Sequence, residues 1–337
     1  MDAAITAIEY SLPRRILDND QLAKEFADWT PEKILAKTGI RERHVATEEE
    51  CASDFAIEAA NRLLNSNICS RDEIDYVLYC TQSPDYFLPT TACMLQDRLE
   101  LKLSCGAMDF NLGCSGYVYG LGLAKGLVES GQASRILFLT AETYSKYIHP
   151  CDKSVRTLFG DGATATLISG IESEFPVIGP FVYGTDGSGM NNLIVPTGGL
   201  RKARVQDAAL ISDESGNART INNLYMNGPA IFNFTLRVVP DTVSRILAQA
   251  ELEIEDIDLF VFHQASKLML DHLQKKLKVP AERFWVAMDD VGNTVSCTIP
   301  IALKRALEAG KIRPGHLVML VGFGVGYSWG ATLVRWV

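Results

Sequence analysis

An internal repeat constrains the fold of this chain more than any other feature of its sequence. Three pairs of segments match at a nearly constant separation of about 180 residues, roughly half the chain: Glu73–Cys80 with Asp256–His263, Ala107–Phe110 with Ala287–Asp290, and Glu129–Gly131 with Glu308–Gly310. One match can arise by chance, but three in register at one offset indicate two copies of one structural unit. We therefore expect two halves with the same order of helices and strands.

Apolar strand-like runs alternate with helical patterns in both halves. Asp75–Cys80 and Arg135–Thr140 are typical of strands, and Ser53–Leu64 and Thr90–Leu99 are typical of helices. Nearly continuous apolar strands between helices indicate an α/β protein whose sheet is covered on both faces. The span Gly184–Asn223 is rich in Gly, Asn, Asp and Ser, and it predicts loops at the junction of the two halves.

The repeat also predicts where a functional site would form. It aligns Asn293 with Cys114, each at a strand-to-helix corner, and it aligns the strand that ends at His263 with Tyr76–Cys80. Because open α/β sheets bind ligands at the carboxyl ends of their strands, we expect Cys114, His263 and Asn293 to lie close together.

Cys114 lies in a Gly-Cys-Ser-Gly corner between a strand-like run and a helical run from about Tyr117 to Ser130. The amino end of a helix carries a partial positive charge and free N–H groups, which favour a thiolate. The sequence therefore makes Cys114 a candidate nucleophile. The alternative is a small core residue, since free cysteines are often buried.

His263 differs from the other four histidines of the chain. His44, His149 and His316 have loop or turn neighbours, and His272 has the charged neighbours of a solvated helix face. His263 instead ends an apolar strand. A lone buried histidine is more often structural than catalytic, but the repeat places this one beside Cys114.

Composition excludes several classes of protein. The net charge of −9 and the absence of any basic run argue against a nucleic-acid surface. No apolar stretch reaches the ~18 residues of a membrane helix, so we expect no membrane insertion. The eight cysteines have no C-x-x-C or zinc-finger spacing, and the N-terminus has no signal-peptide pattern. We expect a cytoplasmic protein with reduced thiols and no metal.

Five motifs together carry a resemblance to a known family: Thr38–His44, Phe159–Ala163, His263–Ala265, Gly292–Thr294 and Gly322–Gly330. In collinear order over essentially the whole chain, they resemble the β-ketoacyl-acyl-carrier-protein synthase III family of the thiolase-like superfamily. The resemblance implies a five-layer αβαβα sandwich. It also implies duplicated halves at residues 1–172 and 173–337, and a homodimer.

The resemblance implies a catalytic triad of Cys114, His263 and Asn293. In that role Cys114 holds an acyl group as a thioester, and His263 and Asn293 stabilise the enolate formed when a malonyl thioester loses CO₂. The backbone N–H groups of Cys114 and Gly326 would stabilise the tetrahedral oxyanion. A neutral Asn293 favours carbon–carbon bond formation over base-assisted acyl transfer, although a Gly-Asn pair is also an ordinary turn.

The same resemblance implies substrate-binding positions in both halves: Leu88, Phe159, Phe232, Lys37, Gln264 and Lys267. Leu88 would close the acyl pocket of the partner subunit. Core packing is an equally good interpretation of Phe159 and Phe232.

The chain departs from the family on the path of the acyl donor. Lys33 and Lys37 stand where members that use acyl-CoA carry tryptophan and arginine, and lysine offers no flat stacking surface. Pro229 replaces an asparagine near the pantetheine arm. Leu268 replaces a basic carrier-docking residue, with Lys267 just before it. Either CoA binds differently, or an acyl-carrier protein delivers the acyl group.

The sequence thus predicts an acyltransferase of EC class 2.3.1 in fatty acid or related acyl or polyketide biosynthesis. Cys114 would be loaded from acyl-CoA or an acyl-carrier protein and would then condense with malonyl-acyl-carrier protein, with no further cofactor. One alternative is transfer of the acyl group to an alcohol, amine or other nucleophile. Another is a non-catalytic subunit of a heterodimeric synthase, against which the intact triad argues.

Overall fold

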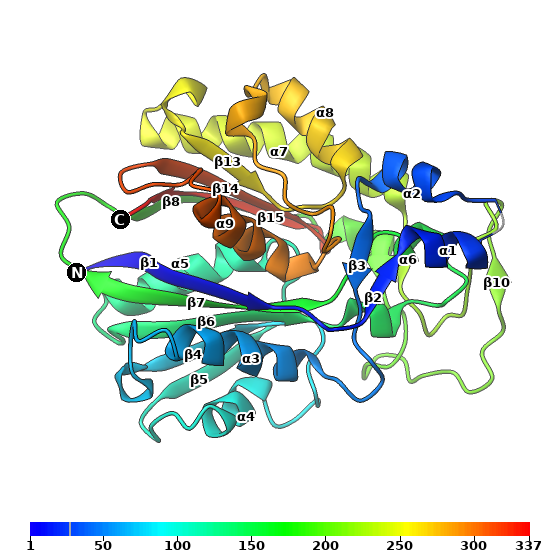
Figure 1. Ribbon diagram of the computed structural model, residues 1–337, viewed down its shortest axis with the longest axis horizontal. Coiled ribbons are helices and arrows are strands. Elements are labelled where there is room, and N and C mark those ends of the chain that lie inside the picture. Colours follow the sequence, from blue (N-terminus) through cyan, green and yellow to red (C-terminus); the bar gives the residue numbers. More distant parts are fainter. Residues whose placement is uncertain (27) are drawn as a thin grey trace.

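The computed structural model describes residues 1–26 and 28–337. These residues form two main sheets that lie one above the other (Figure 1). The first sheet has the strand order β1 (Asp2–Ser11), β7 (Gly162–Ile171), β6 (Arg135–Glu142), β4 (Tyr76–Cys80), β5 (Gly106–Phe110). Strands β6, β4 and β5 are parallel, whereas β7 is antiparallel to both β6 and β1.

The second sheet repeats this topology with one strand fewer. Its order is β13 (Leu259–Phe262), β14 (Leu317–Gly324), β15 (Ser328–Arg335), β8 (Ile178–Thr185). Strands β13 and β14 are parallel, and β15 is antiparallel to both of its neighbours. Counted from the edge strands β1 and β8, the strands of the two sheets therefore follow the same pattern of parallel and antiparallel neighbours, as the repeat predicts.

Helices form three further layers. The outer face of the first sheet is covered by α3 (Ala52–Leu64) and α4 (Thr91–Arg98), and that of the second sheet by α7 (Gly228–Ala250) and α8 (Lys267–Leu277). Between the sheets lie α5 (Gly116–Glu129) and α9 (Thr298–Glu308), whose apolar side chains join both sheets in one core. The five-layer αβαβα sandwich expected from the sequence is confirmed.

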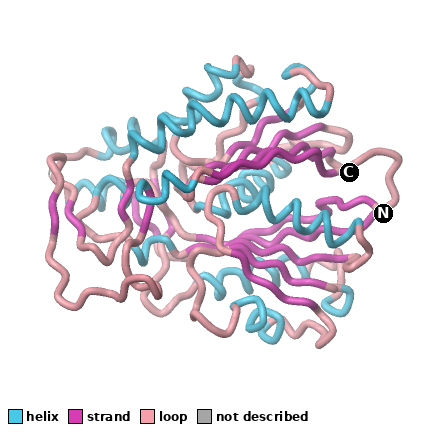
Figure 2. The backbone as a smooth tube through the Cα atoms, turned by 180° about the vertical axis from the view of Figure 1, so that it is seen from behind, coloured by secondary structure: helices cyan, strands magenta, loops and turns pink. Residues whose placement is uncertain are grey.

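Short elements gather at the end of the molecule away from the two termini (Figures 1 and 2). They are α1 (Asn19–Glu25), α2 (Pro31–Thr38), α6 (Lys153–Arg156) and the strand pairs β2 (Ile16–Asp18) with β3 (Glu42–His44), β9 (Leu193–Ile194) with β12 (Tyr225–Met226), and β10 (Ile211–Ser212) with β11 (Ala218–Arg219). No helix of the described residues has the length and apolar character that crossing a membrane requires.

One strand expected from the repeat does not form. Residues 287–290 match β5 in sequence, but they join no ladder; only Phe284 makes an isolated bridge, to Phe260. The side chain of Gln264 takes the place of ladder hydrogen bonds. Its Oε1 accepts from the N–H of Ala287 at 2.9 Å, and its Nε2 donates to the carbonyl of Phe262 at 2.6 Å. The expected strand at Ala287–Asp290 is thus wrong, because a side chain satisfies the backbone there.

The loop-rich span is also placed differently from the expectation. The chain leaves the first sheet at Ile171 and enters the second at Ile178, so the crossing precedes Gly184–Asn223. That span lies within the second half, after β8, rather than at the junction. The division of the chain into domains at residue 172 stays a prediction.

Helix α5 fits between the sheets because glycines line one of its sides. A Cβ atom on Gly116 would lie 2.3 Å from the sulfur of Cys80, and one on Gly120 would lie 2.1 Å from the ring of Phe138. Gly126, on the same helix, has no heavy atom within 4 Å of such a Cβ among the described residues. The missing side chains let α5 approach the first sheet closely and carry Cys114 to its position.

This packing predicts opposite effects for two alanine substitutions in α5. Gly120→Ala forces the buried ring of Phe138 to move, so the free energy of unfolding should fall by about 1–3 kcal/mol. Gly126→Ala only gains helix propensity at an exposed site, so the free energy of unfolding should rise by ~1 kcal/mol. Urea denaturation of both variants measures the difference; equal effects would contradict the close packing.

Candidate active site

The strand ends bring the three predicted residues to one cavity of about 490 Å³. His263 directly follows β13, Cys114 follows β5 and precedes α5, and Asn293 precedes α9. All three line the cavity together with mostly apolar side chains, including Phe159, Phe232, Leu158, Leu193, Ile231, Met269 and Phe323. The structure therefore brings together the residues that the repeat predicts to converge.

Cys114 is 5% exposed and lies under the backbone of β14. A Cβ atom on Gly324 would be 2.8 Å from the Cβ of Cys114, and one on Gly322 would be 2.8 Å from its carbonyl oxygen. Such distances exclude any side chain, so these two glycines are required by close backbone approach. Backbone atoms of the second half thus cover the thiol of the first half.

Burial raises the pKa of Cys114 to about 12, and the charge of Glu142, when ionised, adds to the effect. The backbone N–H groups of Cys114 and Val325 act in the opposite direction. The expectation that the helix start favours a thiolate is wrong for the resting site, because desolvation outweighs it. Cys114 therefore rests as a neutral thiol.

The amide of the second half that lies against the sulfur belongs to Val325. Gly326, which the sequence resemblance indicates for the oxyanion hole, lines a different cavity and packs against Ser328. Val325 lines that cavity as well, so the assignment of Gly326 to an oxyanion hole stays a prediction.

His263 is 2% exposed, and its ring stands edge-on to Phe323 with centroids 5.4 Å apart. Burial lowers the pKa of His263 to about 3, so the ring is neutral at physiological pH. Its Nδ1 lies 2.7 Å from the hydroxyl of Thr298. A neutral imidazole carries one N–H and one acceptor nitrogen, and it is a weak base here.

Asn293 is held by hydrogen bonds from two sides. Its Oδ1 accepts from the N–H of Val295 at 2.9 Å, which orients the amide so that Nδ2 is the donor end; Nδ2 also contacts the carbonyl of Ala265 at 3.3 Å. Its backbone bridges Phe159 as an isolated β-bridge. Val295 has φ +57°, a left-handed conformation that is costly for a β-branched residue.

Aromatic side chains limit the cavity beside Cys114. Phe159 is 3% exposed and packs against Tyr144 with ring centroids 5.2 Å apart. Phe159 also lines a second cavity of about 470 Å³, together with Arg15 and Lys146. Tyr144 belongs to the same apolar cluster as Cys114 and was not among the residues expected from the sequence.

Comparison with known proteins identifies the family. The profile of 3-oxoacyl-acyl-carrier-protein synthase III matches residues 108–187, and its C-terminal counterpart matches residues 247–336. A β-ketoacyl-acyl-carrier-protein synthase III of Syntrophomonas wolfei is 34% identical over 336 residues, covering 100% of this chain and 98% of that protein. The chain belongs to the β-ketoacyl-acyl-carrier-protein synthase III family.

Solved structures of synthase III proteins have the same fold. A crystal structure of a 3-oxoacyl-(acyl-carrier-protein) synthase III has a TM-score of 0.98 at 54% identity, with all of both chains covered. The 3-oxoacyl-(acyl-carrier protein) synthase of Burkholderia xenovorans has a TM-score of 0.91 at 37% identity, covering 100% of this chain and 94% of that one.

Four of the expected substrate-binding residues lie outside the lining of the synthase cavity. The amide of Gln264 is occupied by the backbone groups of Phe262 and Ala287. Lys267 pairs with Asp271 at 2.6 Å on the surface of α8. Leu88 is 84% exposed, and Lys37 projects over the ring of Trp29. Phe159 and Phe232, by contrast, line the cavity as expected.

Trp29 supplies an aromatic surface next to the two lysines that replace the family's tryptophan and arginine. The ammonium groups of Lys33 and Lys37 lie 5.4 and 4.7 Å from its ring centroid. A tryptophan four residues before Lys33 is visible in the sequence, but only the turn into α2 brings it under both lysines.

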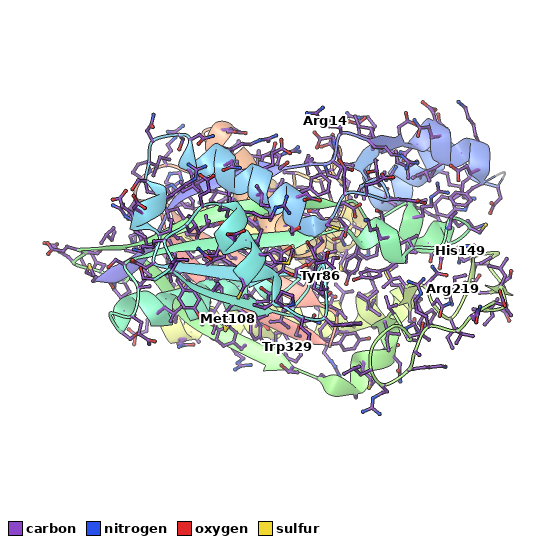
Figure 3. The ribbon with its side chains drawn as sticks, turned by 90° about the horizontal axis from the view of Figure 1, so that it is seen from below. Arg14, Tyr86, Met108, His149, Arg219 and Trp329 are labelled. Atoms are coloured by element: carbon purple, nitrogen blue, oxygen red, sulfur yellow. The ribbon has the colours of Figure 1, made fainter. Side chains whose placement is uncertain are left out.

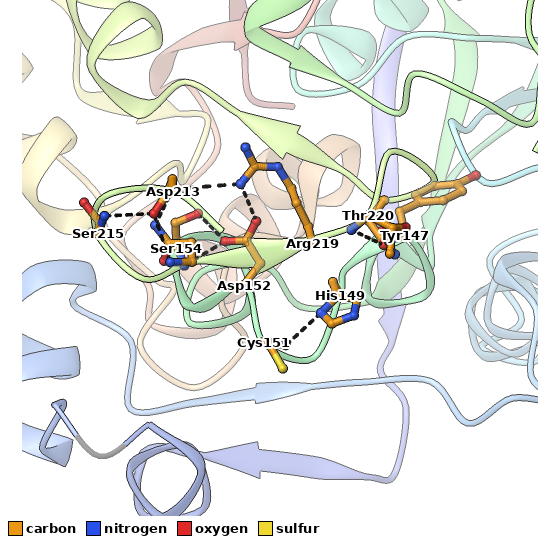
Figure 4. Close-up of polar contacts among 11 residues, drawn as sticks. Tyr147, His149, Cys151, Asp152, Ser154, Asp213, Ser215, Arg219 and Thr220 are labelled. Carbon is orange, nitrogen blue, oxygen red and sulfur yellow. Dashed lines mark hydrogen bonds and ion pairs between the residues drawn. The ribbon is translucent and has the colours of Figure 1, made fainter. Parts of the chain in front are cut away.

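A surface segment that includes β10 and β11 is tied to Asp152 by an ion pair with Arg219 (Figure 4). Arg219 lies 3.3 Å from the buried carboxylate of Asp152 and 3.9 Å from Asp213. Asp152 also caps α6, and Phe159 follows shortly after that helix. The network therefore fixes the segment that carries the aromatic wall of the cavity.

Glu142 is a buried carboxyl group that the sequence analysis did not single out. It ends β6 and accepts hydrogen bonds from Gln82 N–H at 3.0 Å, Ser83 at 3.1 Å and Ser296 at 2.8 Å. It thus joins a loop of the first half to the turn after Asn293. In the sequence, the sign of this buried carboxyl group is a glutamate at the end of an apolar strand.

The described residues contain no group of three or more His, Cys, Asp or Glu side chains that could hold a metal ion.

The environment of Glu142 predicts a pH dependence of stability. Burial raises the pKa of Glu142 to about 8, so the folded protein holds this proton more tightly than the unfolded chain. Stability is therefore lost as the pH rises through 8, by at most about 1.4 kcal/mol per pH unit. Glu142→Gln removes this loss, so its free energy of unfolding relative to wild type should increase from pH 5 to pH 8.

Urea denaturation at pH 5, 6.5, 8 and 9 measures this difference. Glu174→Gln, an exposed carboxylate on the surface, controls for the loss of one charge. A constant difference between Glu142→Gln and wild type across this range would contradict the raised pKa.

Proposed function

We propose that this protein catalyses a decarboxylative Claisen condensation, with Cys114 as the acyl carrier and malonyl-acyl-carrier protein as the extender. The observation that carries the proposal is the convergence of Cys114, neutral His263 and neutral Asn293 in one apolar cavity. Family membership supports the reaction class, which is that of an acyltransferase in fatty acid biosynthesis.

In the loading step, the sulfur of Cys114 attacks the carbonyl carbon of an acyl thioester. A carbon–sulfur bond forms, the bond to the donor sulfur breaks, and the donor leaves as a thiol with the proton of Cys114. The N–H groups of Cys114 and Val325 are suited to stabilise the oxyanion between these events.

In the condensation step, the malonyl thioester loses CO₂ and becomes an enolate. Its carbon attacks the acyl carbon on Cys114, and the sulfur leaves as a thiolate that takes up one proton. His263 and the Nδ2 of Asn293 supply hydrogen bonds to the enolate oxygen. The apolar cavity disfavours the malonyl carboxylate relative to uncharged CO₂, since a buried charge is costly.

The electrostatics weigh against the alternative of base-assisted acyl transfer. A base must accept a proton from an alcohol or amine, but burial keeps the pKa of His263 at about 3. Asn293 is neutral and cannot act as a base. Carbon–carbon bond formation needs only hydrogen-bond donors to the enolate oxygen. It is therefore the better match to this site.

A carrier protein is the partner that the cavity rim fits best. Leu268 is 52% exposed and also lines the cavity, and Lys33, Lys37 and Lys267 lie on the neighbouring helices α2 and α8. Lysines on α2 and α8 beside this apolar residue suit a partner with an acidic surface. We call these three lysines the basic rim. The eight cysteines form no disulfide in the described residues, which fits a reducing, cytoplasmic setting.

The exposed edge of the first sheet supports a homodimer. Strand β5 is an edge strand, and Met108 on it is 36% exposed; Tyr86, Phe87 and Leu88 are 61%, 79% and 84% exposed. Figure 3 labels Met108 and Tyr86 in a view from below. An exposed apolar edge of this kind suits pairing with a second copy. In such a dimer Leu88 would reach the partner's acyl cavity.

Loading and condensation are expected to separate in two variants. Cys114→Ala should abolish acylation, which intact-mass and peptide analysis detect after incubation with an acyl thioester. Asn293→Ala should leave acylation of Cys114 nearly unchanged and slow CO₂ release from malonyl-carrier protein by about 10²–10³-fold.

Acylation at a residue other than Cys114 would overturn the mechanism. Acylation of Cys114 without CO₂ release in the wild-type protein would favour the acyltransferase alternative.

The basic rim predicts which donor loads the enzyme. Acyl-carrier protein should acylate Cys114 faster than the matching acyl-CoA, and Lys33→Glu/Lys37→Glu should slow loading from the carrier protein about tenfold at low salt. Loading from a small uncharged acyl thioester should not change. Lys311→Glu, which lies before the amino end of β14 and away from the cavity, is the matched control. Equal loading by CoA and carrier protein would contradict the proposal.

A further inference from the structure

The hydroxyl of Thr298 is the hydrogen-bonding partner of His263 in the structure. The Oγ1 of Thr298 lies 2.7 Å from Nδ1 of the ring and 3.0 Å from the carbonyl oxygen of Val295. Thr298 is 3% exposed, so water does not compete for these contacts. One hydroxyl proton therefore has two possible acceptors.

The carbonyl of Val295 already has another donor. The backbone N–H of Thr298 points to it as the cap of the short turn Val295–Cys297. The hydroxyl contact is also the longer of the two, 3.0 Å against 2.7 Å for Nδ1, and 2.7 Å is the usual length of a hydrogen bond donated by a hydroxyl. The hydroxyl proton is thus best placed on the side of His263.

We infer that Thr298 is a positioning residue that fixes the tautomer of His263 by donating a hydrogen bond to Nδ1. The proton of the neutral ring is then on Nε2, which is the nitrogen left to face the cavity. This inference rests on the proposed function for its consequence in catalysis, but the tautomer itself is a property of the resting protein.

The tautomer assigns His263 to the condensation step and not to the loading step. An Nε2–H group donates a hydrogen bond to the enolate oxygen, and it cannot accept a proton from the thiol of Cys114. Thr298 should therefore matter for loss of CO₂ and not for loading. In the opposite tautomer Nε2 would present a lone pair to the enolate oxygen, and the interaction would be repulsive.

The turn that precedes Thr298 also orients Asn293, the second hydrogen-bond donor of the site. Val295 adopts its left-handed conformation with its N–H on Oδ1 of Asn293 and its carbonyl on Thr298. Ser296 anchors the turn by donating to Glu142 at 2.8 Å. A strained conformation persists where several contacts determine it. One turn thus sets both the amide of Asn293 and the ring of His263.

Replacement of the hydroxyl by a methyl group tests the inference. In ¹⁵N spectra of histidine-labelled protein, wild-type His263 should show an unprotonated Nδ1 and a protonated Nε2, assigned by the signals that His263→Gln removes. Thr298→Val should shift the ring toward protonated Nδ1 or a mixture. It should slow CO₂ release at least about tenfold, up to the 10²–10³-fold typical of a lost donor, while acylation of Cys114 is retained.

Two further variants separate positioning from packing. Thr298→Ser keeps the hydroxyl and should restore both the Nε2–H signal and most of the CO₂ release. Thr235→Val is the matched control, because Thr235 is fully buried in α7 and its hydroxyl has no hydrogen-bond partner among the described residues.

Protonated Nδ1 in the wild-type protein, or an unchanged tautomer in Thr298→Val, would overturn the inference. So would slow CO₂ release in Thr298→Ser together with a wild-type loading rate. Failure of the wild-type protein to acylate Cys114 would instead overturn the proposed function and leave the tautomer result standing.

Discussion

The two halves depend on the contact between the backbone of β14 and the start of α5. Gly322 and Gly324 admit Cys114 and Ser115 at distances that no side chain allows, and the hydroxyls of Ser115 and Ser328 meet across this seam at 2.7 Å. Because the contact is made by backbone atoms, its geometry tolerates little variation. It fixes the position of α5 between the two sheets. It also fixes the positions of the backbone amides that surround the thiol of Cys114.

Neutral groups dominate the site. The Cys114 thiol and the His263 ring are both uncharged at rest because burial penalises their charged forms. Asn293 and the backbone amides of Cys114 and Val325 contribute dipoles rather than charges. In a cavity with few polar groups, such fixed dipoles act on a developing oxyanion without reorganisation. Under the proposed function, these dipoles would stabilise charge that exists only during the reaction.

The sequence predicts the fold well where the pattern is local or repeated. The repeat correctly indicates two matching sheets and the convergence of Cys114, His263 and Asn293 at strand ends. It fails at residues 287–290, because the side chain of Gln264 replaces a ladder that no pattern excludes. The pKa of Cys114 follows from its burial beneath the second half, and the contact of Thr298 with His263 follows from the packing of α9 against β13. Neither has a local signal in the sequence.

Phe159 has a consequence for the history of this enzyme. This residue lines two cavities of about 490 and 470 Å³, one beside Cys114 and one beside Arg15 and Lys146. A smaller residue at this single position would therefore enlarge the space on both. The size of the cavity beside Cys114 is therefore open to change in one mutational step, without any alteration of the turn after Asn293 or of the sheets.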